Sequence, residues 1–376
     1  MKLIYIANAR IPTEKAHGIH IMKMCEALAG LAEVQLIIPC RFNHIKKNPF
    51  EYYGIERNFK ITKLPCLDLI PLDKFIGHFG LWVESATFFI SLFFYALFKK
   101  TDVIYTRDKY SLPLSFFKKN LIFEIHTFPK NYGFYAPFFK RAETIVVITR
   151  GLKNLFISKG ILADKILVAP DGVDIKQFQI SNNKSQIREK LGLPQDPKIV
   201  LYAGHLYKWK GVQILAEASR FLPEDAAVYF VGGTAQDIRK FEIRNSKFGI
   251  KMVGHRPYAE IPYWLKAADV LVLPNSGVEE ISKHWTSPLK MFEYMASKTP
   301  IVASALPSIR EILNEENAVL IEPDNPKALA QGIKKVLENS QLSDKISIRA
   351  FQDVQNYTWQ KRVQEIYEHF NKIKNQ

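Results

Sequence analysis

The amino-acid sequence predicts an α/β protein built on two open parallel sheets, and three observations lead to this fold class. Short apolar segments of strand length alternate with amphipathic segments throughout the chain, which is typical of parallel sheets covered by helices. The 376 residues exceed the roughly 250–300 at which a single core stops growing, so two domains of ordinary size fit. The alternation also starts afresh after a polar stretch near residue 180.

The first half has the elements of one such sheet. A helix is predicted from residue 20 to residue 31, because its apolar side chains recur at helical spacing. Strands are predicted at residues 3–7, 34–38, 103–105, 121–125 and 144–148. The first of these begins the chain, and it is too short and lacks the cleavage site that a signal peptide needs.

The second half repeats the pattern after the turn Asp171-Gly172-Val173-Asp174 and a polar segment at residues 181–185. Strands are predicted at residues 199–203, 227–231, 270–273 and 301–303, and helices at 211–221, 290–296 and 359–373. We therefore place a first domain at residues 1–180 and a second at 181–356. Ligands of such sheets bind beyond the carboxyl ends of the strands, so function is expected where the two domains face each other.

The charge is strongly basic and unevenly distributed. The net charge is +15, and residues 1–180 hold 25 Lys and Arg against 15 Asp and Glu. Such a surplus attracts anionic lipid or phosphorylated substrates. Nucleic acid is not expected as a partner, because no nucleic-acid-binding module accompanies the charge. A solvated basic face without a partner remains the alternative.

The longest apolar stretch runs over residues 86–98 and is followed by Lys99-Lys100. Thirteen residues are fewer than the roughly 20 that cross a bilayer. Two interpretations remain open, a buried helix and a helix that dips into a membrane surface. The three cysteines show no metal-ligand spacing and fit a reducing compartment, so we expect a cytoplasmic protein, with attachment to the inner face of the membrane as a further hypothesis.

The segment Ser287-Pro288-Leu289-Lys290 followed by Glu293 is the strongest local signal. Ser287 suits an N-cap and Pro288 the first helical position, which leaves free backbone N–H groups as an anion site. Lys290 adds a cation where the helix dipole disfavours one, which makes sense if an anion binds. Glu293, one turn later, can reach a second polar part of the same ligand. An ordinary capped helix is the alternative interpretation.

These residues, with Pro274 and Pro300-Ile301-Val302-Ala303-Ser304, resemble the donor-binding region of retaining GT-B glycosyltransferases, particularly glycosyltransferase family 4. The resemblance covers most of the chain and is most specific in the second half. It implies two Rossmann-like domains facing a central cleft, with the nucleotide-sugar donor bound mainly by the second. It also implies a C-terminal helix, residues 357–376, that crosses back to the first domain.

The resemblance implies a role for several residues of the second half. Glu293 matches the acidic residue that binds the ribose hydroxyls, and Lys210 matches a basic residue of the pyrophosphate clamp. The companion arginine falls on His205, beside Gly204, and Lys290 or Lys208 would restore the missing charge. The expected donor site therefore consists of Gly18, Gly204, His205, Lys210, Ser287, Pro288, Leu289, Lys290 and Glu293.

Two more positions, Trp285 and Lys298, depart from the family pattern. The first acidic residue of the family's Glu-x7-Glu motif falls on Trp285, and Glu279 or Glu280 would take over its contacts. A related subset instead carries Ser-Pro-Leu-Lys-x-x-Glu, which this chain matches in full. Lys298 stands where relatives often have a glycine, so we expect it to adopt a strained φ.

In the first half, Gly18 is expected in a turn just before the first helix, where the family's backbone approaches the donor phosphates. His126 follows the predicted strand at residues 121–125 and corresponds to a histidine that contacts the donor sugar. Glu124 and Arg107 are lesser candidates. His126, Lys210 and Glu293 are the expected catalytic residues.

The implied activity is metal-independent transfer of a hexose, with retention, from a UDP- or GDP-linked sugar to a glycan or lipid-linked acceptor in surface polysaccharide synthesis. The nucleotide sugar is a substrate, and no cofactor is expected. Two rival interpretations stay open. One is another GT-B enzyme such as a sugar-nucleotide epimerase, and the other is a non-catalytic nucleotide- or glycan-binding subunit.

Overall fold

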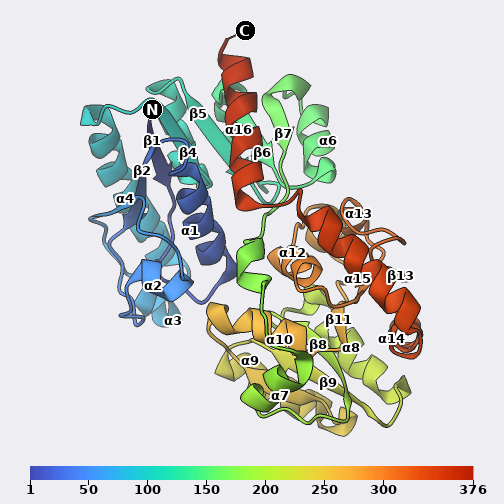
Figure 1. Ribbon diagram of the computed structural model, residues 1–376. Coiled ribbons are helices and arrows are strands. Elements are labelled where there is room, and N and C mark those ends of the chain that lie inside the picture. Colours follow the sequence, from blue (N-terminus) through green and yellow to red (C-terminus); the bar gives the residue numbers. More distant parts are fainter. Residues whose placement is uncertain (376) are drawn as a thin grey trace. The chain divides into compact units, whose positions relative to one another are not determined.

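The computed structural model describes residues 1–375 of the chain, which fold into two compact units (Figure 1). The first unit comprises Met1–Ile148, Leu152–Ala169 and the residues from Trp359 onward. The second comprises Thr149–Gly151 and Pro170–Thr358. Residues 170–180, which we grouped with the first half from the sequence, belong to the second unit.

The first unit is built on a seven-stranded parallel sheet with the order β3-β2-β1-β4-β5-β6-β7. All five predicted strands of this half are present, and β3 and β7 are added at the two edges. The bounds are β1 Lys2–Ile6, β2 Glu33–Pro39, β3 Lys60–Leu64, β4 Val103–Thr106, β5 Leu121–Ile125, β6 Thr144–Val147 and β7 Ile166–Val168. The strand order reverses between β1 and β4, which is the switch point of this sheet.

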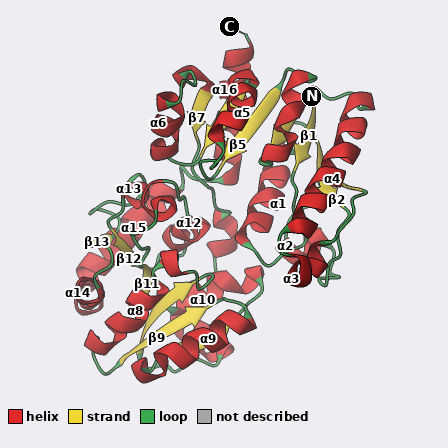
Figure 2. Cartoon of the chain, turned by 180° about the vertical axis from the view of Figure 1, so that it is seen from behind, coloured by secondary structure: helices red, strands yellow, loops and turns green. Residues whose placement is uncertain are grey.

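Helices cover this sheet on both faces, as the predicted class requires. Figure 2 shows its strands in yellow between red helices. The α-helices are α1 Ala16–Leu28, α2 Pro49–Tyr53, α3 Asp73–Ile76, α4 Phe79–Phe98, α5 Tyr132–Arg141, α6 Arg150–Ser158 and α16 Trp359–Lys374, with 3-10 turns η1 Ile70–Leu72, η2 Lys109–Phe116 and η3 Ala163–Lys165. Helix α1 begins at Ala16, four residues before the predicted start, so Gly18 lies inside its first turn and not in a preceding loop.

The C-terminal helix α16 returns to the first unit, where it packs on α1 and on β6 (Figure 1, red). Its apolar face holds Trp359, Val363, Ile366 and Phe370, all at most 2% exposed. The spacing of these residues predicts one buried face, and the structure confirms it. The last helix of the chain, which has sixteen residues, is therefore part of the core of the first unit.

Helix α4 differs from the prediction in length. The apolar stretch at residues 86–98 is the second part of a twenty-residue helix, because Phe79, Gly80, Leu81, Trp82 and Val83 continue the helix toward the N-terminus. By length and composition alone, this helix is sufficient to cross a membrane. Of its most apolar window, 28% is buried inside the protein. The conclusion that the stretch is too short to cross a bilayer is thus wrong.

The second unit is built on a six-stranded parallel sheet with the order β10-β9-β8-β11-β12-β13. The strands are β8 Lys198–Ala203, β9 Ala226–Val231, β10 Lys251–Gly254, β11 Val270–Leu273, β12 Ile301–Ser304 and β13 Val319–Ile321. The helices are α7 Lys184–Leu191, α8 Val212–Ala218, α9 Ala235–Asn245, α10 Ile261–Ala267, α11 Glu280–His284, α12 Leu289–Ala296, α13 Pro307–Arg310, α14 Pro326–Glu338 and α15 Ser340–Val354, with 3-10 turns η4 Ile175–Phe178, η5 Lys208–Lys210, η6 Ser219–Phe221, η7 Ser246–Phe248 and η8 Tyr258–Glu260.

Both faces of the second sheet are buried, which explains why its strands are apolar at nearly every position. On β8, Ile199 and Leu201 belong to one hydrophobic cluster, while Val200 and Tyr202 belong to the cluster on the other face. The strand order reverses between β8 and β11. The loops that follow these two strands therefore begin at the switch point of the sheet, where ligands of doubly wound folds bind.

Lys298, two residues after the end of α12, confirms one expectation. Lys298 has a φ of 58°, in the left-handed region that favours glycine. Its ammonium lies 4.1 Å from the centroid of the Phe351 ring, a contact that offsets part of the strain.

We predict that Lys298→Gly is more stable than Lys298→Ala by about 0.5–1 kcal/mol, because both variants lose the ring contact and only alanine keeps the backbone strain. Chemical denaturation of the two variants measures the difference. The matched pair at Lys345, exposed within α15, should show the opposite order, since glycine costs about 1 kcal/mol in a helix interior. Equal stability of the two Lys298 variants would contradict the strain.

Candidate functional site

The candidate site of the second unit gathers where β8 and β11 end and α12 begins. Gly204 and His205 directly follow β8, and Lys290 and Glu293 lie on α12. The two elements are held together by Tyr294, whose buried hydroxyl accepts a hydrogen bond from the Ala203 backbone N–H at 2.8 Å. The side chains of α12 therefore face the carboxyl end of β8.

The start of α12 differs from the prediction. The helix begins at Leu289, Pro288 is its N-cap residue, and no side chain caps it. Ser287 lies one position earlier, and its hydroxyl accepts a hydrogen bond from the backbone N–H of Asp171 at 3.1 Å. Ser287 thus fastens the Asp171-Gly172 turn to the start of α12, and its predicted role as the N-cap is wrong because the helix starts two residues after it.

Lys290 is the most unusual residue of the site. The side chain is 7% exposed, and its ammonium lies 3.6 Å from the centroid of the Tyr202 ring. Among the residues that the structure describes, this ammonium has no hydrogen-bond partner. Burial, with the neighbouring charge of Lys210, lowers the pKa of Lys290 well below its ordinary value. A buried ammonium without hydrogen-bond acceptors costs folding free energy unless an anion binds to it.

Two further titratable groups accompany Lys290. Burial raises the pKa of Glu293 to about 7, although a hydrogen bond from Tyr258 and the charges of Lys290 and Lys210 oppose the shift. Burial lowers the pKa of Lys210 to about 8, against the attraction of Glu293. Opposite charges and perturbed pKa values at the carboxyl edge of a parallel sheet are typical of a functional site.

The turn that carries Lys210 is fixed by backbone contacts. A Cβ at Gly211 would lie 1.7 Å from the Pro274 carbonyl oxygen, and the φ of Gly211 is 69°, so only glycine fits. The Trp209 carbonyl accepts hydrogen bonds from the Ser276 N–H at 3.0 Å and from the Ser282 hydroxyl at 3.2 Å. The loop after β11 thus holds the lysine turn close to the end of that strand.

Aromatic rings surround the cations of this site. The Lys210 ammonium lies 5.3 Å from the Trp209 ring and 5.5 Å from the Tyr207 ring. His205 stacks on Tyr207 at 5.2 Å, and its carbonyl accepts a hydrogen bond from the Tyr202 hydroxyl at 2.7 Å. His205 therefore lies on the same segment as Lys210, in the place where the resemblance puts an arginine.

Gly204 and Gly232 allow the backbone segments that follow β8 and β9 to lie close to each other. Gly204 has a φ of 135° and Gly232 one of 114°. A Cβ on Gly232 would lie 2.6 Å from the Gly204 carbonyl oxygen, which is an impossible contact. The predicted importance of Gly204 thus has a backbone reason that is independent of any ligand.

Several residues of the site were not predicted from the sequence. Tyr202 and Tyr258 contact Lys290 and Glu293, respectively. Asn275, fully buried two residues after the end of β11, has no hydrogen-bond partner for its amide among the described residues. Its position after an apolar strand was a usable signal, because polar residues at the carboxyl ends of parallel strands point to ligands. The two tyrosines gave no such signal, since aromatic residues in strands and turns are ordinary.

The residues around the missing acidic position lie on α11 and next to it. Glu279 precedes the helix and Glu280 begins it, and both side chains are exposed. Trp285 follows the end of the helix and is half-buried. No carboxylate therefore stands at position 285 itself, and the nearest ones in sequence are on the other end of this short helix.

The candidate residues of the first unit are centred on the carboxylate of Glu124, on β5. One carboxylate oxygen accepts hydrogen bonds from His126 Nε2 at 2.6 Å and from the Arg362 guanidinium at 3.0 Å, and His20 Nε2 lies 2.9 Å from the same oxygen. The other oxygen accepts one from the Tyr105 hydroxyl. Burial alone would raise the pKa of Glu124, but Arg362 and the two histidines hold it well below its ordinary value.

This arrangement fixes the orientation of both histidine rings. The Arg107 guanidinium donates to His20 Nδ1 at 2.8 Å, so the ring proton of a neutral His20 sits on Nε2, which faces Glu124. His126 points its own Nε2 at the same carboxylate, which leaves Nδ1 as the other ring atom available for contacts. The lesser candidates Glu124 and Arg107 thus act as partners of histidines.

Gly18 lies apart from this carboxylate, and its surroundings explain it by packing. A Cβ there would lie 2.2 Å from the Tyr53 hydroxyl. That hydroxyl accepts from the Thr13 N–H at 2.7 Å and donates to the Thr13 carbonyl at 2.8 Å. Gly18 therefore allows Tyr53 to fasten the loop between β1 and α1.

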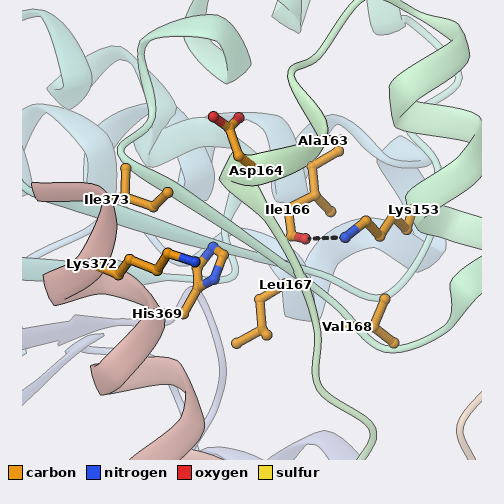
Figure 3. A pocket seen from close by; sticks show the side chains of 9 residues that line it. All are labelled: Lys153, Ala163, Asp164, Ile166, Leu167, Val168, His369, Lys372 and Ile373. Atoms are coloured by element: carbon orange, nitrogen blue, oxygen red, sulfur yellow. Dashed lines mark hydrogen bonds between the residues drawn. The ribbon is translucent and has the colours of Figure 1, made fainter. Parts of the chain in front are cut away.

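Two hollows, one in each unit, lie away from these residues. Figure 3 shows one of about 270 Å³ in the first unit, lined by β7 and by His369, Lys372 and Ile373 of α16. Its Lys153 ammonium is already bound to the Ile166 carbonyl at 2.8 Å. Another, of about 330 Å³, lies in the second unit beside Lys198 and Pro300, at the amino ends of β8 and β12. Neither hollow is lined by a predicted site residue.

The sequence of the second unit is similar to known glycosyltransferases. Residues 183–353 match the family model described as glycosyl transferases group 1. A D-inositol 3-phosphate glycosyltransferase of Xylanimonas cellulosilytica is 29% identical over 210 residues, 52% of this chain and 49% of that protein. TuaC of Bacillus subtilis, a glycosyltransferase provisionally assigned to teichuronic acid biosynthesis, is 28% identical over 170 residues, 45% of this chain and 40% of TuaC. The chain spans about half the length of the curated relatives it matches.

The fold of the whole chain also has a solved counterpart. HepE from Anabaena, crystallised with UDP and glucose, superposes with a TM-score of 0.78 at 19% identity, over 99% of this chain and 100% of HepE. Two Rossmann-like parallel sheets with a returning C-terminal helix constitute the GT-B fold, so the predicted fold class is confirmed. The chain thus has the fold of GT-B glycosyltransferases and is similar in sequence to a glycosyltransferase family model and to known glycosyltransferases.

We predict that Lys290→Met raises the free energy of unfolding by about 1–4 kcal/mol at pH 7, because a buried charge is replaced by an apolar chain of similar volume. The pKa of Lys290 is lowered in the folded state, so the wild-type protein gains stability as the pH rises. The advantage of the variant should thus shrink toward pH ~10, where an unfolded lysine also loses its proton. Denaturation at pH 6 and pH 9 measures the difference in stability between Lys290→Met and the wild type. Lys283→Met, at an exposed position, is the control. A destabilised Lys290→Met would contradict this account.

A second prediction concerns the Glu124 carboxylate. Arg362→Met should cost about 3–5 kcal/mol at pH 7, because it leaves a buried carboxylate without its main counter-charge. The pKa of Glu124 is depressed in the folded state, so this stabilisation is present above pH ~4 and is lost as the pH falls further. Denaturation curves against pH provide the measurement. The exposed Arg349→Met, which also removes carboxylate contacts, should change little, and a similar loss in both variants would refute the assignment.

Proposed function

We propose that this chain is a retaining glycosyltransferase of family 4 that transfers a hexose from a nucleotide-diphosphate sugar to a glycan or lipid-linked acceptor in surface polysaccharide synthesis. The observation that carries the proposal is the buried ammonium of Lys290, which has no acceptor among the described residues and has Lys210 and Glu293 as charged neighbours. These groups suit a ligand that is anionic at one end and rich in hydroxyl groups at the other. A nucleoside diphosphate has that chemistry.

In this proposal Lys290 and Lys210 bind the diphosphate, and Glu293 accepts hydrogen bonds from the ribose hydroxyls. Transfer breaks the bond between the sugar and the diphosphate, and negative charge grows on the leaving oxygen. Fixed cations in a dry site stabilise that charge, which is usually the largest contribution to such catalysis. These cations would serve in place of a metal ion, and His126 is the proposed contact to the donor sugar.

The pKa values of the free protein give this site a preferred pH range. Glu293, with a pKa of about 7, is ionised above neutrality, and Lys210, with a pKa of about 8, keeps its proton below pH 8. Both groups carry their useful charges together only near neutral pH. A bound diphosphate widens the range because it raises the pKa of an adjacent lysine.

The nucleotide is proposed to be UDP or GDP. HepE binds UDP with the same fold, which supports a uridine nucleotide. A cytoplasmic location fits a nucleotide-sugar donor and the absence of a cysteine pattern typical of secreted proteins.

Lys210→Ala and Glu293→Ala should each weaken the binding of the matching nucleoside diphosphate by about 10–150-fold, the value of one hydrogen bond to a charged group. Isothermal titration with UDP and with GDP measures the loss, and Lys283→Ala on neighbouring α11 should bind as the wild type does. The affinity of the wild type should also fall above pH 8, as Lys210 loses its proton. Unchanged affinity in both site variants would end the assignment.

The rival functions are separated by a product assay. Trp285 and His205 stand where the family has an acid and an arginine, which favours a non-catalytic nucleotide- or glycan-binding subunit as the second candidate. Incubation with nucleotide sugars and lipid-linked or glycan acceptors distinguishes the outcomes. Free nucleoside diphosphate with a glycosylated acceptor supports transfer, whereas an epimerised donor supports an epimerase. Binding without turnover of any nucleotide sugar supports the subunit.

A further inference from the structure

We propose that one face of the first unit, formed by α4, the end of η2 and α5, docks on an anionic lipid surface, with the aromatic side chains of α4 inserted among the lipids. We call this surface the aromatic–basic face. This face belongs to the first unit, whereas the nucleotide site belongs to the second. It would determine the location of the protein at a membrane, and it would not affect which donor the protein binds.

Helix α4 has two apolar faces, and only one of them is covered. Phe88, Leu92 and Ala96 recur at every fourth position and are at most 2% exposed. Half a turn away, a second series at the same spacing is exposed, formed by Trp82, Ala86, Ile90 and Phe94, with Leu97 and Phe98 at its end. The helix lies at the outer flank of its sheet in both views (Figures 1 and 2).

The outward side of α4 also lacks the charges that keep a surface helix in water. Glu84 is the one charged residue among the twenty, and it is fully buried, where its carboxylate accepts a hydrogen bond from the Asn8 amide at 3.1 Å. A helix on the surface of a soluble domain normally has a polar outer face. This one exposes Trp82 at 66% and Phe94 at 56% instead.

Neighbouring elements extend the apolar surface. Phe93 of α4 contacts Phe117 at 5.2 Å between ring centroids, and Phe116 contacts Phe138 of α5 at 5.3 Å. Phe116 and Phe117 are 51% and 58% exposed. At the other end, Phe75 of α3 is 86% exposed. The exposed rings therefore run from α3 along α4 to η2 and α5, a larger area than scattered surface residues produce.

Basic residues border the aromatic rings. Lys99 and Lys100 follow the last turn of α4, and the Lys118 ammonium reaches the Lys99 carbonyl at 3.5 Å. The Arg141 guanidinium lies 4.7 Å from the Phe116 ring. Lys119 and Lys140, both exposed, belong to the same segments. Each cation near an anionic membrane surface contributes about 1 kcal/mol to binding, so this rim distinguishes anionic from neutral lipid.

The buried face of α4 decides how the helix meets the membrane. Phe88 and Leu92 pack into the first unit, where α4 contacts β3 and η2. A helix that crossed the bilayer would have to abandon these contacts and carry Glu84 into the lipid. The helix therefore lies along the surface with its outer face immersed, as amphipathic interfacial helices do. Aromatic rings with lysine and arginine at their edge suit that depth.

Vesicle flotation with the full-length chain tests the proposal. The protein should bind vesicles of phosphatidylglycerol and phosphatidylcholine at low salt, and bind pure phosphatidylcholine at least tenfold more weakly. The variant Ile90→Gln/Phe94→Gln should lose about tenfold or more in binding, and Lys99→Gln/Lys100→Gln should lose about tenfold on anionic vesicles only. The control Ile243→Gln/Val278→Gln removes two apolar residues of the second unit that are more exposed, at 72% and 79%, than Ile90 and Phe94, and it should bind like the wild type.

Three results would overturn the proposal. They are no vesicle binding at low salt, wild-type binding by Ile90→Gln/Phe94→Gln, and an equal loss in the control variant. Sedimentation of the free protein gives a further arm, because a dimer that Ile90→Gln/Phe94→Gln dissociates, without vesicle binding by the wild type, would identify a protein interface instead. Nucleoside diphosphate affinity, measured without vesicles, should be the same in all variants, so failure here leaves the donor site untouched.

Discussion

The burial of the Lys290 ammonium is the constraint on which the second unit's site depends. A lysine that is nearly inaccessible to water, held against the ring of Tyr202, costs folding free energy in the absence of an anion. The surrounding residues keep it in place. Tyr294 ties α12 to the end of β8, and the glycine at 211 brings the lysine turn against the Pro274 carbonyl. A site with such cations held in advance needs little rearrangement when negative charge develops.

The same lysine explains the unusual pKa values around it. Glu293 and Lys210 are each shifted toward their neutral forms by burial, and their mutual attraction does not cancel the shift. A ligand that supplies negative charge to the lysines and hydroxyl donors to the carboxylate would favour the charged form of both. The site is therefore built at some expense to stability, which is the usual relation between function and folding.

In the first unit, the buried carboxylate of Glu124 is the group that holds the candidate residues together. Glu124 binds two histidines from different elements and an arginine from α16, which lies 238 residues further along the chain. The C-terminal helix is thus joined to the histidine pair by a buried ion pair as well as by apolar packing. This gives the return of α16 to the first unit a chemical consequence, because the orientation of His126 depends on a residue of the last helix.

The sequence by itself determined the fold class, the two sheets and the amphipathic last helix. Each of these depends on local periodicity, and such information lies within a few neighbouring residues. It also singled out Lys290 and Glu293 by their places at the start of a helix, whereas Lys210 and the left-handed backbone at Lys298 were expected from the family resemblance. Tertiary structure alone decided what those residues touch. Tyr202 lies beneath Lys290 because β8 and α12 pack together, and Ser287 binds Asp171 because two turns far apart in sequence meet. The length of α4 and the exposure of its second apolar face were likewise decided by packing, because composition cannot tell which side of an entirely apolar helix the core will cover.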